Sequence, residues 1–140
     1  MENYSYLITV AIAWVLTQII KSIVRTIERG KFEVNYLAES GGMPSVHAAF
    51  VVSFTTLAWL NEGWSSTLFA LSGVLAVVVM YDAINVRYAV GKQAEALNAL
   101  IKEKKSKVPP VEVIRGHHLV EVLVGAAIGA TVAIVVFLTI

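Results

Sequence analysis

The sequence predicts an all-α integral membrane protein with four transmembrane helices, and three observations lead to this fold class. Apolar residues make up 57% of the 140 residues and charged residues only 15%, a balance unlike that of soluble domains. Four long apolar runs each approach the roughly 20 residues that a helix needs to cross a bilayer. All 11 lysines and arginines lie between the first and second runs or between the third and fourth. We therefore expect a single membrane domain over residues 1–140.

The four expected spans occupy most of the chain, at approximately residues 4–23, 44–60, 64–82 and 118–140. Helices are the expected form, because hydrocarbon offers the backbone no hydrogen-bonding partner outside the segment itself. The short connection Asn61-Glu62-Gly63 makes the middle two spans an antiparallel hairpin. The third helix should extend past Tyr81 as a cytoplasmic or interfacial helix, since residues 82–104 contain many helix formers and no proline.

The charge distribution predicts the topology. An even number of spans puts both basic loops, 24–43 and 83–116, on one side, which the positive-inside rule makes cytoplasmic. Both termini then lie outside the cell membrane. The N-terminus lacks the basic stretch and cleavage site of a secretory signal, so the first run is interpreted as a retained span. The absence of cysteine excludes disulfides and thiolate chemistry, and we expect no nucleic-acid partner.

A glycine-rich segment precedes the second span. Gly41 and Gly42 allow positive backbone dihedrals and a close approach to a ligand, and Pro44 suits the start of a helix. The helix N-terminus beside Ser45 is a potential anion site, and His47 lies one turn further on. The alternative is an ordinary helix start with a histidine at the membrane boundary.

A second cluster opens the last span. His117, Glu121, Gly125 and Gly129 recur every four residues and share one helical face. A carboxylate four residues after a histidine can orient its ring, and a charge within a span is a functional candidate. The alternative is that Glu121 only pairs with Arg115 and that the glycines serve helix packing.

Cations follow the third span. Asp82, Arg87 and Lys92 lie just past its expected end, and Lys21 lies at the end of the first span. Arginine and lysine bind phosphate oxygens, although most such residues serve only as membrane anchors. Alternating helix directions should bring His47, His117 and Arg87 to one boundary, as phosphoryl transfer from a membrane-anchored substrate requires.

Three stretches carry a family resemblance that covers nearly the whole chain. They are Gly41-Gly42-Met43-Pro44-Ser45-Val46-His47, Met80-Tyr81-Asp82-Ala83 through Arg87 to Gly91-Lys92-Gln93-Ala94-Glu95, and Gly116-His117 with Glu121-Val122-Leu123. These stretches resemble the divergent branch of the type 2 phosphatidic acid phosphatase superfamily, which also contains vanadium haloperoxidases.

The resemblance implies a phosphatase without a metal or other cofactor, acting on a lipid phosphate or an isoprenoid (di)phosphate. His117 would attack phosphorus and form a phosphohistidine, Glu121 would orient it, and His47 would protonate the leaving group. The implied phosphate-binding residues are Ser45, Gly42, Lys21, Arg87, Arg115 and Lys92.

Departures from the superfamily pattern keep alternatives open. Val111 stands where the superfamily has an arginine six residues before the nucleophile, and Glu28 stands where it has an arginine seven residues after Lys21. One alternative is a non-catalytic lipid-phosphate-binding or assembly protein that retains the fold. Another is a metal-dependent enzyme that uses Asp82, Glu95 and Glu121, because carboxylates suit magnesium. The small size and the glycine stripe also indicate a homodimer.

Overall fold

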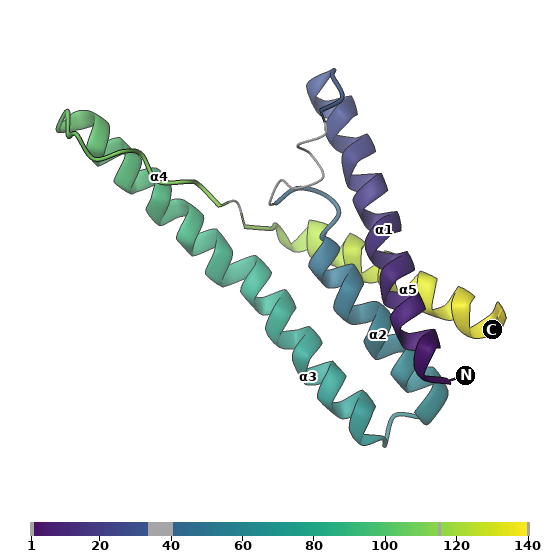
Figure 1. Ribbon diagram of the computed structural model, residues 1–140. Coiled ribbons are helices and arrows are strands. Elements are labelled where there is room, and N and C mark those ends of the chain that lie inside the picture. The colour runs from purple at the N-terminus through teal and green to yellow at the C-terminus, as the bar shows by residue number, and fades with distance from the viewer. Residues whose placement is uncertain (1, 34–40, 115, 140) are drawn as a thin grey trace.

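The computed structural model describes residues 2–33, 41–114 and 116–139, and its regular structure is helical throughout that part of the chain, without a strand (Figure 1). The elements are α1 (Glu2–Arg29), α2 (Val46–Glu62), α3 (Thr67–Tyr81), the π-helical segment η2 (Asp82–Val86), α4 (Arg87–Glu103) and α5 (Leu119–Thr139). The predicted all-α class is confirmed.

Helix α2 is the centre of the bundle. It contacts α1, α3 and α5, and α1 also contacts α5. Small side chains such as Ala49 and Ala58 are fully buried on α2, whereas Leu71 and Val74 of α3 face outward. Apolar side chains on the outer surface are expected where lipid is the solvent. The bundle therefore buries the small side chains on one face of α2 and presents apolar side chains on its outer surface.

Among the residues that the structure describes, three helical segments are long and apolar enough to cross a membrane: Tyr4–Arg29, Thr67–Glu103 and Leu119–Thr139. They correspond to the first, third and fourth predicted spans. Helix α2 has 17 residues, at the short end of what a bilayer crossing requires. Its crossing stays a prediction, although α2 is apolar and packed among the three longer helices.

Serines and a glycine set the ends of the central hairpin. The hydroxyl of Ser45 accepts a hydrogen bond from the Ala48 N–H at 3.4 Å, and that of Ser66 accepts one from the Phe69 N–H at 3.1 Å. Such caps satisfy N–H groups that lack partners within the helix. Gly63, at φ 79°, ends α2. The α2–α3 connection therefore comprises residues 63–66, slightly later than the Asn61–Gly63 turn that we expected.

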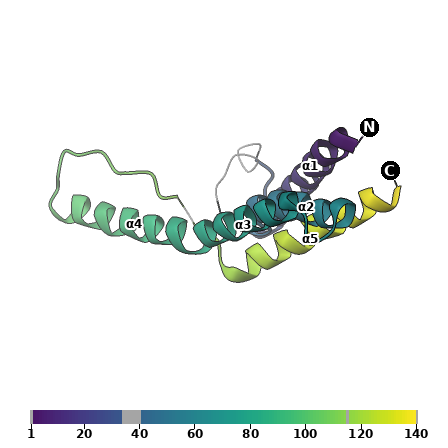
Figure 2. The ribbon, with the colours of Figure 1, turned by 90° about the horizontal axis from the view of Figure 1, so that it is seen from below.

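Helices α3 and α4 are joined through η2 into one continuous helical segment, Thr67–Glu103 (Figure 2). At 1.5 Å per residue its 37 residues span about 55 Å, well beyond a hydrocarbon core of about 30 Å. The predicted helical extension past Tyr81 is confirmed, and much of the expected loop 83–116 is helix. The expected loop 24–43 is also helical as far as Arg29.

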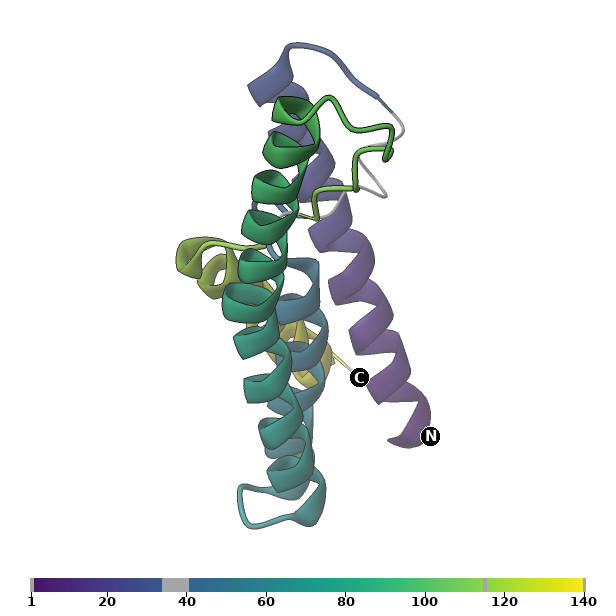
Figure 3. The same ribbon diagram turned by 90° about the vertical axis from the view of Figure 1, so that its left-hand side faces the viewer.

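The chain returns toward the bundle along α4 (Figure 3). The Asn98 side chain donates to the Val111 carbonyl at 2.9 Å and accepts from the Val111 N–H at 2.8 Å. This pair of bonds holds Val111 against α4, and we call the segment that contains it, residues 104–114, the return loop. The return loop thereby delivers His117 to the junction between α3 and α4.

Two hydrogen bonds mark opposite ends of the bundle. At one end, which joins the first turns of α1 to the last residue of α2, the Tyr6 hydroxyl donates to Glu62 Oε1 at 3.1 Å. At the other end the Ser45 N–H donates to the Glu121 carbonyl at 2.9 Å. The first residues of α2 and α5 therefore lie side by side, far from the termini.

Glycines allow α5 to approach α2 closely. A Cβ on Gly125 would overlap the Ser45 carbonyl, and one on Gly129 would overlap the Ala49 carbonyl. Small residues at helix interfaces permit such backbone contact in membranes. The glycine stripe is thus used within the chain, and a homodimer, which stays a prediction, would need another surface.

Replacing Gly129 with alanine should loosen the bundle. The added carbon meets backbone that cannot rotate away, so we expect a loss of about 1–3 kcal/mol in the free energy of unfolding. Gly73 of α3 has open space around its Cα, so Gly73→Ala is the matched control and should be neutral or slightly stabilising. Thermal unfolding in detergent would measure both. Equal melting temperatures for the two variants would contradict the packing described.

Cysteine labelling tests the four-span topology, because the natural chain contains no cysteine. Lys31→Cys and Lys105→Cys should react with a membrane-impermeant maleimide from the same side. Ser65→Cys, in the α2–α3 connection, should react only from the other side. Labelling of the two lysine positions from opposite sides would show that one of the four helices does not cross.

Candidate functional site

The best-defined part of the candidate site is the pair His117–Glu121 at the start of α5. His117 Nδ1 lies 2.8 Å from Glu121 Oε2, and the His118 N–H also donates to that oxygen, at 3.3 Å. The His117 N–H donates to the Ala83 carbonyl of η2 at 3.0 Å. Backbone and side chain of His117 are therefore both held, from η2 and from α5.

This geometry decides which imidazole nitrogen is reactive. A carboxylate oxygen can only accept, so the proton of a neutral His117 lies on Nδ1 and the lone pair on Nε2. The residue is buried, with 5% of its surface exposed. The pair thus presents Nε2 as a fixed nucleophile or base. The sequence predicted the orienting contact from the four-residue spacing.

Two opposing effects act on the His117 imidazole. Burial lowers its pKa below the usual 6.5, because desolvation disfavours the charged ring, and nearby Lys21 and Arg87 act in the same direction. The Glu121 carboxylate opposes them by stabilising the protonated form. Burial prevails, so the neutral ring is favoured at neutral pH.

His47 lies in the first turn of α2, directly after the capped N-terminus. Arg87, His117, Lys21 and Asp82 all interact electrostatically with its ring. These residues come from α1, η2, α4 and the segment before α5. The structure therefore brings together the two histidines and Arg87, as expected, at the end of the bundle that carries the Ser45–Glu121 hydrogen bond.

Helix α1 supplies two buried cations to this end. Lys21 is 5% exposed and Arg25, one turn later, is 7% exposed. The Arg25 guanidinium lies against Gly42, where a Cβ would overlap it. Gly42 has φ 84° and Gly41 φ 74°, conformations that glycine adopts without strain. The sequence reasoning missed Arg25, although its four-residue spacing from Lys21 signals a shared helical face.

The π-helical segment positions Arg87. Its Nε donates to Asp82 Oδ2 at 2.8 Å, and its backbone N–H bonds to the Asp82 carbonyl. Residues five apart do not face each other on an α-helix, but the wider π turn aligns them. Asp82 is therefore the partner of Arg87, and the spacing alone did not reveal this.

The remaining predicted residues are distributed as follows. Ser45 is fully buried as the α2 cap. Lys92 forms an exposed ion pair with Glu95 at 3.0 Å, in a neighbouring pocket lined by His118, and it is not among the groups that act on His47 or His117. Arg115 lies outside the described residues.

The described residues do not assemble the magnesium site that was considered as an alternative. Asp82 pairs with Arg87, Glu95 with Lys92 and Glu121 with His117. Within residues 2–33, 41–114 and 116–139, no three metal-ligating side chains gather as a group. The three carboxylates instead each serve a different basic partner.

The fold and this cluster define a multi-pass helical membrane protein that concentrates two histidines and several cations at one end. The chain matches the divergent PAP2 family over residues 2–132, and it belongs to that family. It is 31% identical to the uncharacterized membrane protein YuiD of Bacillus subtilis (strain 168), with 96% of this chain and 94% of the relative covered. No solved structure matches it. The family resemblance of the three sequence stretches is thus confirmed.

The electrostatics of His117 give a prediction that does not depend on activity. Its imidazole should titrate below pH 6.5 in the folded protein, and Glu121→Gln should lower that pKa further, because the carboxylate is the group that raises it. Histidine NMR spectra across a pH series in detergent would measure both values. A His117 pKa above 6.5, or one that rises in Glu121→Gln, would contradict the description.

Proposed function

We propose that this protein is a membrane phosphatase that hydrolyses a lipid phosphate or an isoprenoid (di)phosphate at the cytoplasmic leaflet through a phosphohistidine intermediate. The observation that supports it is the contact of buried His117 with half-buried Glu121, with Nε2 unprotonated and with His47, Lys21 and Arg87 close by. Membership of the divergent PAP2 family points to the same chemistry.

The first half of the reaction transfers the phosphoryl group to the protein. His117 Nε2 attacks phosphorus, the bond from phosphorus to the ester oxygen breaks, and His47 gives its proton to the departing oxygen. Glu121 holds the His117 ring and stabilises the charge that develops on it. The product is a phosphohistidine and a membrane-anchored alcohol, or a monophosphate when the substrate is a diphosphate.

The second half releases phosphate. Water attacks phosphorus, His47 accepts a proton from that water, and the phosphorus–nitrogen bond breaks. Inorganic phosphate leaves and His117 regains its lone pair, so the protein ends as it began. No metal or other cofactor enters either step.

Cations would stabilise the negative charge that phosphorus oxygens carry throughout. Lys21 and Arg25 come from α1, and Arg87 comes from the start of α4. The bond from Arg87 to Asp82 uses Nε, so the guanidinium has further donors to offer. The N-terminus of α2, with Ser45 and Gly42, adds backbone dipoles of the right sign.

His117→Ala should abolish phosphate release and His47→Ala should reduce turnover by about 10²–10⁴-fold, the usual contribution of a general acid–base group. The assay would use purified protein, excess chelator and a panel of lipid and isoprenoid phosphates. Acid-labile phosphate bound to protein should form with the natural protein and be absent from His117→Ala. Undiminished turnover by folded His117→Ala would refute the mechanism.

A second candidate function is a non-catalytic binder of lipid phosphates. It is favoured by the pairing of Arg87 with Asp82 and by Val111 in place of the superfamily arginine. The same panel separates the two functions. A natural protein that binds these lipids but releases no phosphate from any of them would be the binder.

A further inference from the structure

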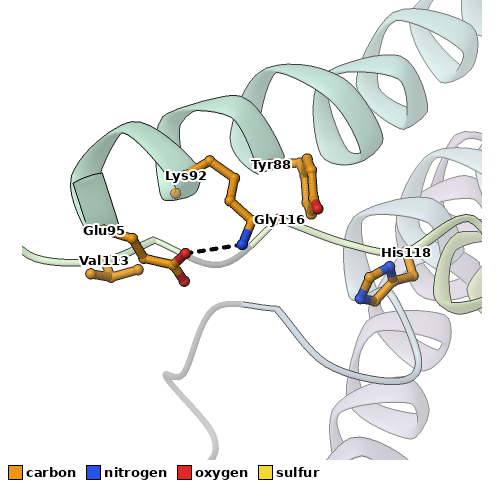
Figure 4. Close-up of a pocket in the computed structure, with 7 residues that line it drawn as sticks. Tyr88, Lys92, Glu95, Val113, Gly116 and His118 are labelled. Carbon is orange, nitrogen blue, oxygen red and sulfur yellow. Dashed lines mark hydrogen bonds and ion pairs between the residues drawn. The ribbon is translucent and has the colours of Figure 1, made fainter. Parts of the chain in front are cut away.

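A polar pocket of about 230 Å³ lies beside the proposed catalytic site, between α4 and the return loop with the residues that follow it. It is lined by Tyr88, Gly91, Lys92, Glu95, Val113, Gly116 and His118 (Figure 4). Gly116 and His118 flank the proposed nucleophile His117 in the chain, so one side of the pocket is built from the segment that carries His117. We call it the α4 pocket.

The α4 pocket explains a sequence motif that phosphoryl transfer leaves unused. Three residues of the stretch Gly91-Lys92-Gln93-Ala94-Glu95 line it. Gly116 on the opposite wall packs against the Tyr88 backbone so closely that a Cβ there would overlap it. The motif therefore forms one wall of the cavity, and Val113, Gly116 and His118 form the other.

Four side chains of different chemistry follow one another along the pocket. His118 lies beside Tyr88, with ring centroids 6.2 Å apart, and Lys92 Nζ lies 6.0 Å from the Tyr88 ring centroid. Lys92 then bonds to Glu95 Oε2 at 3.0 Å. Proceeding from the nucleophile outward, the wall thus offers an imidazole, an aromatic ring, a donor and an acceptor.

This combination selects among ligand chemistries. A second phosphate would meet the Glu95 carboxylate, and Lys92 is already neutralised by that carboxylate. A wholly apolar group would take the Lys92–Glu95 ion pair out of water without offering either side chain a further hydrogen bond. A hydroxyl group can accept from Lys92 and donate to Glu95 at the same time, while its carbon skeleton rests on the Tyr88 ring.

We propose that the α4 pocket binds a polyol moiety attached to the scissile phosphate, so that the preferred substrate is a polyol phosphate ester. This inference rests on the proposed function for the position of the phosphate. The polyol phosphate could be the head group of a lipid or a free molecule, since both offer the same hydroxyl and phosphate groups. A phosphate attached directly to a diacylglycerol would leave the pocket unfilled.

Equilibrium binding tests the proposal without relying on turnover. The protein would carry His117→Ala, be placed in nanodiscs and be titrated with three probes: phosphatidylglycerol phosphate, free glycerol 3-phosphate and phosphatidic acid. Adding Glu95→Gln should weaken the affinity for phosphatidylglycerol phosphate, the lipid-linked polyol phosphate, at least tenfold. The affinity for phosphatidic acid should stay unchanged. An effect on glycerol 3-phosphate as well would show that the head group alone is recognised.

Glu103→Gln is the matched control, since Glu103 is an exposed carboxylate on the same helix outside the pocket. It should leave the affinity for every probe unchanged. The proposal is overturned if phosphatidic acid binds as tightly as the lipid-linked polyol phosphate, or if Glu95→Gln weakens all probes equally.

The two proposals fail in different ways. If the natural protein releases no phosphate from any probe while the effect of Glu95→Gln on binding persists, the phosphatase proposal fails, and the α4 pocket stands as a binding site for the polyol moiety of a polyol phosphate. If phosphate release depends on His117 but polyol binding does not depend on Glu95, only the pocket proposal fails.

Discussion

The close contact between the first turns of α2 and α5 is the constraint on which the rest of the structure depends. Gly125 and Gly129 bring the α5 backbone against Ser45 and Ala49, and the Ser45 N–H bonds to the Glu121 carbonyl. This one contact aligns two helix starts that are far apart in the sequence. It places the residue that orients His117 beside the helix that carries His47. A larger residue at either glycine would push apart the helices that form the candidate site.

The second support of the candidate site comes from η2. Its Ala83 carbonyl accepts the His117 N–H, and its wide turn holds Arg87 against Asp82. Lys21 and Arg25 approach from α1 on the other side. Cations from separate elements therefore lie near His117, and clustered cations attract anionic groups. The fold thus supplies a fixed His117–Glu121 pair with basic side chains close to it.

The sequence predicted much of this arrangement because the relevant signals are local. Hydropathy predicted the three helical segments that are long and apolar enough to cross a membrane, and the run of helix formers after Tyr81 predicted the extension that α4 confirms. The spacing of His117 and Glu121 predicted their contact. Positions that depend on tertiary structure were harder to predict. Lys92 looked equivalent to Arg87 as a phosphate ligand, but the rotation of α4 turns it toward Glu95 and a different cavity.

Other features were missed for identifiable physical reasons. Arg25 resembled a membrane anchor because its burial depends on Gly42, which is distant in the chain. A single π turn has no compositional signal, so the link from Asp82 to Arg87 was not predicted. The glycine stripe was correctly identified as a packing surface, but its partner was α2 of the same chain. For Arg25 and the glycine stripe, the missing information was which distant segment of the chain packs against them. For the π turn, it was the local backbone geometry.

The number of residues in the π turn sets the rotation of α4 about its own axis. Successive residues of an α-helix advance by roughly 100° around that axis, so one residue more or fewer at η2 would rotate every side chain of α4 by about this angle relative to α3. Loss of a single residue between Asp82 and Val86 would preserve the helical character of the segment and every side chain of α4. It would nevertheless rotate α4 away from the return loop and separate the Tyr88 backbone from Gly116. The hydrogen bond from the His117 N–H to the Ala83 carbonyl would be lost as well. The contacts of Gly116 and His117 therefore depend more on the number of residues in η2 than on the identity of most side chains around it.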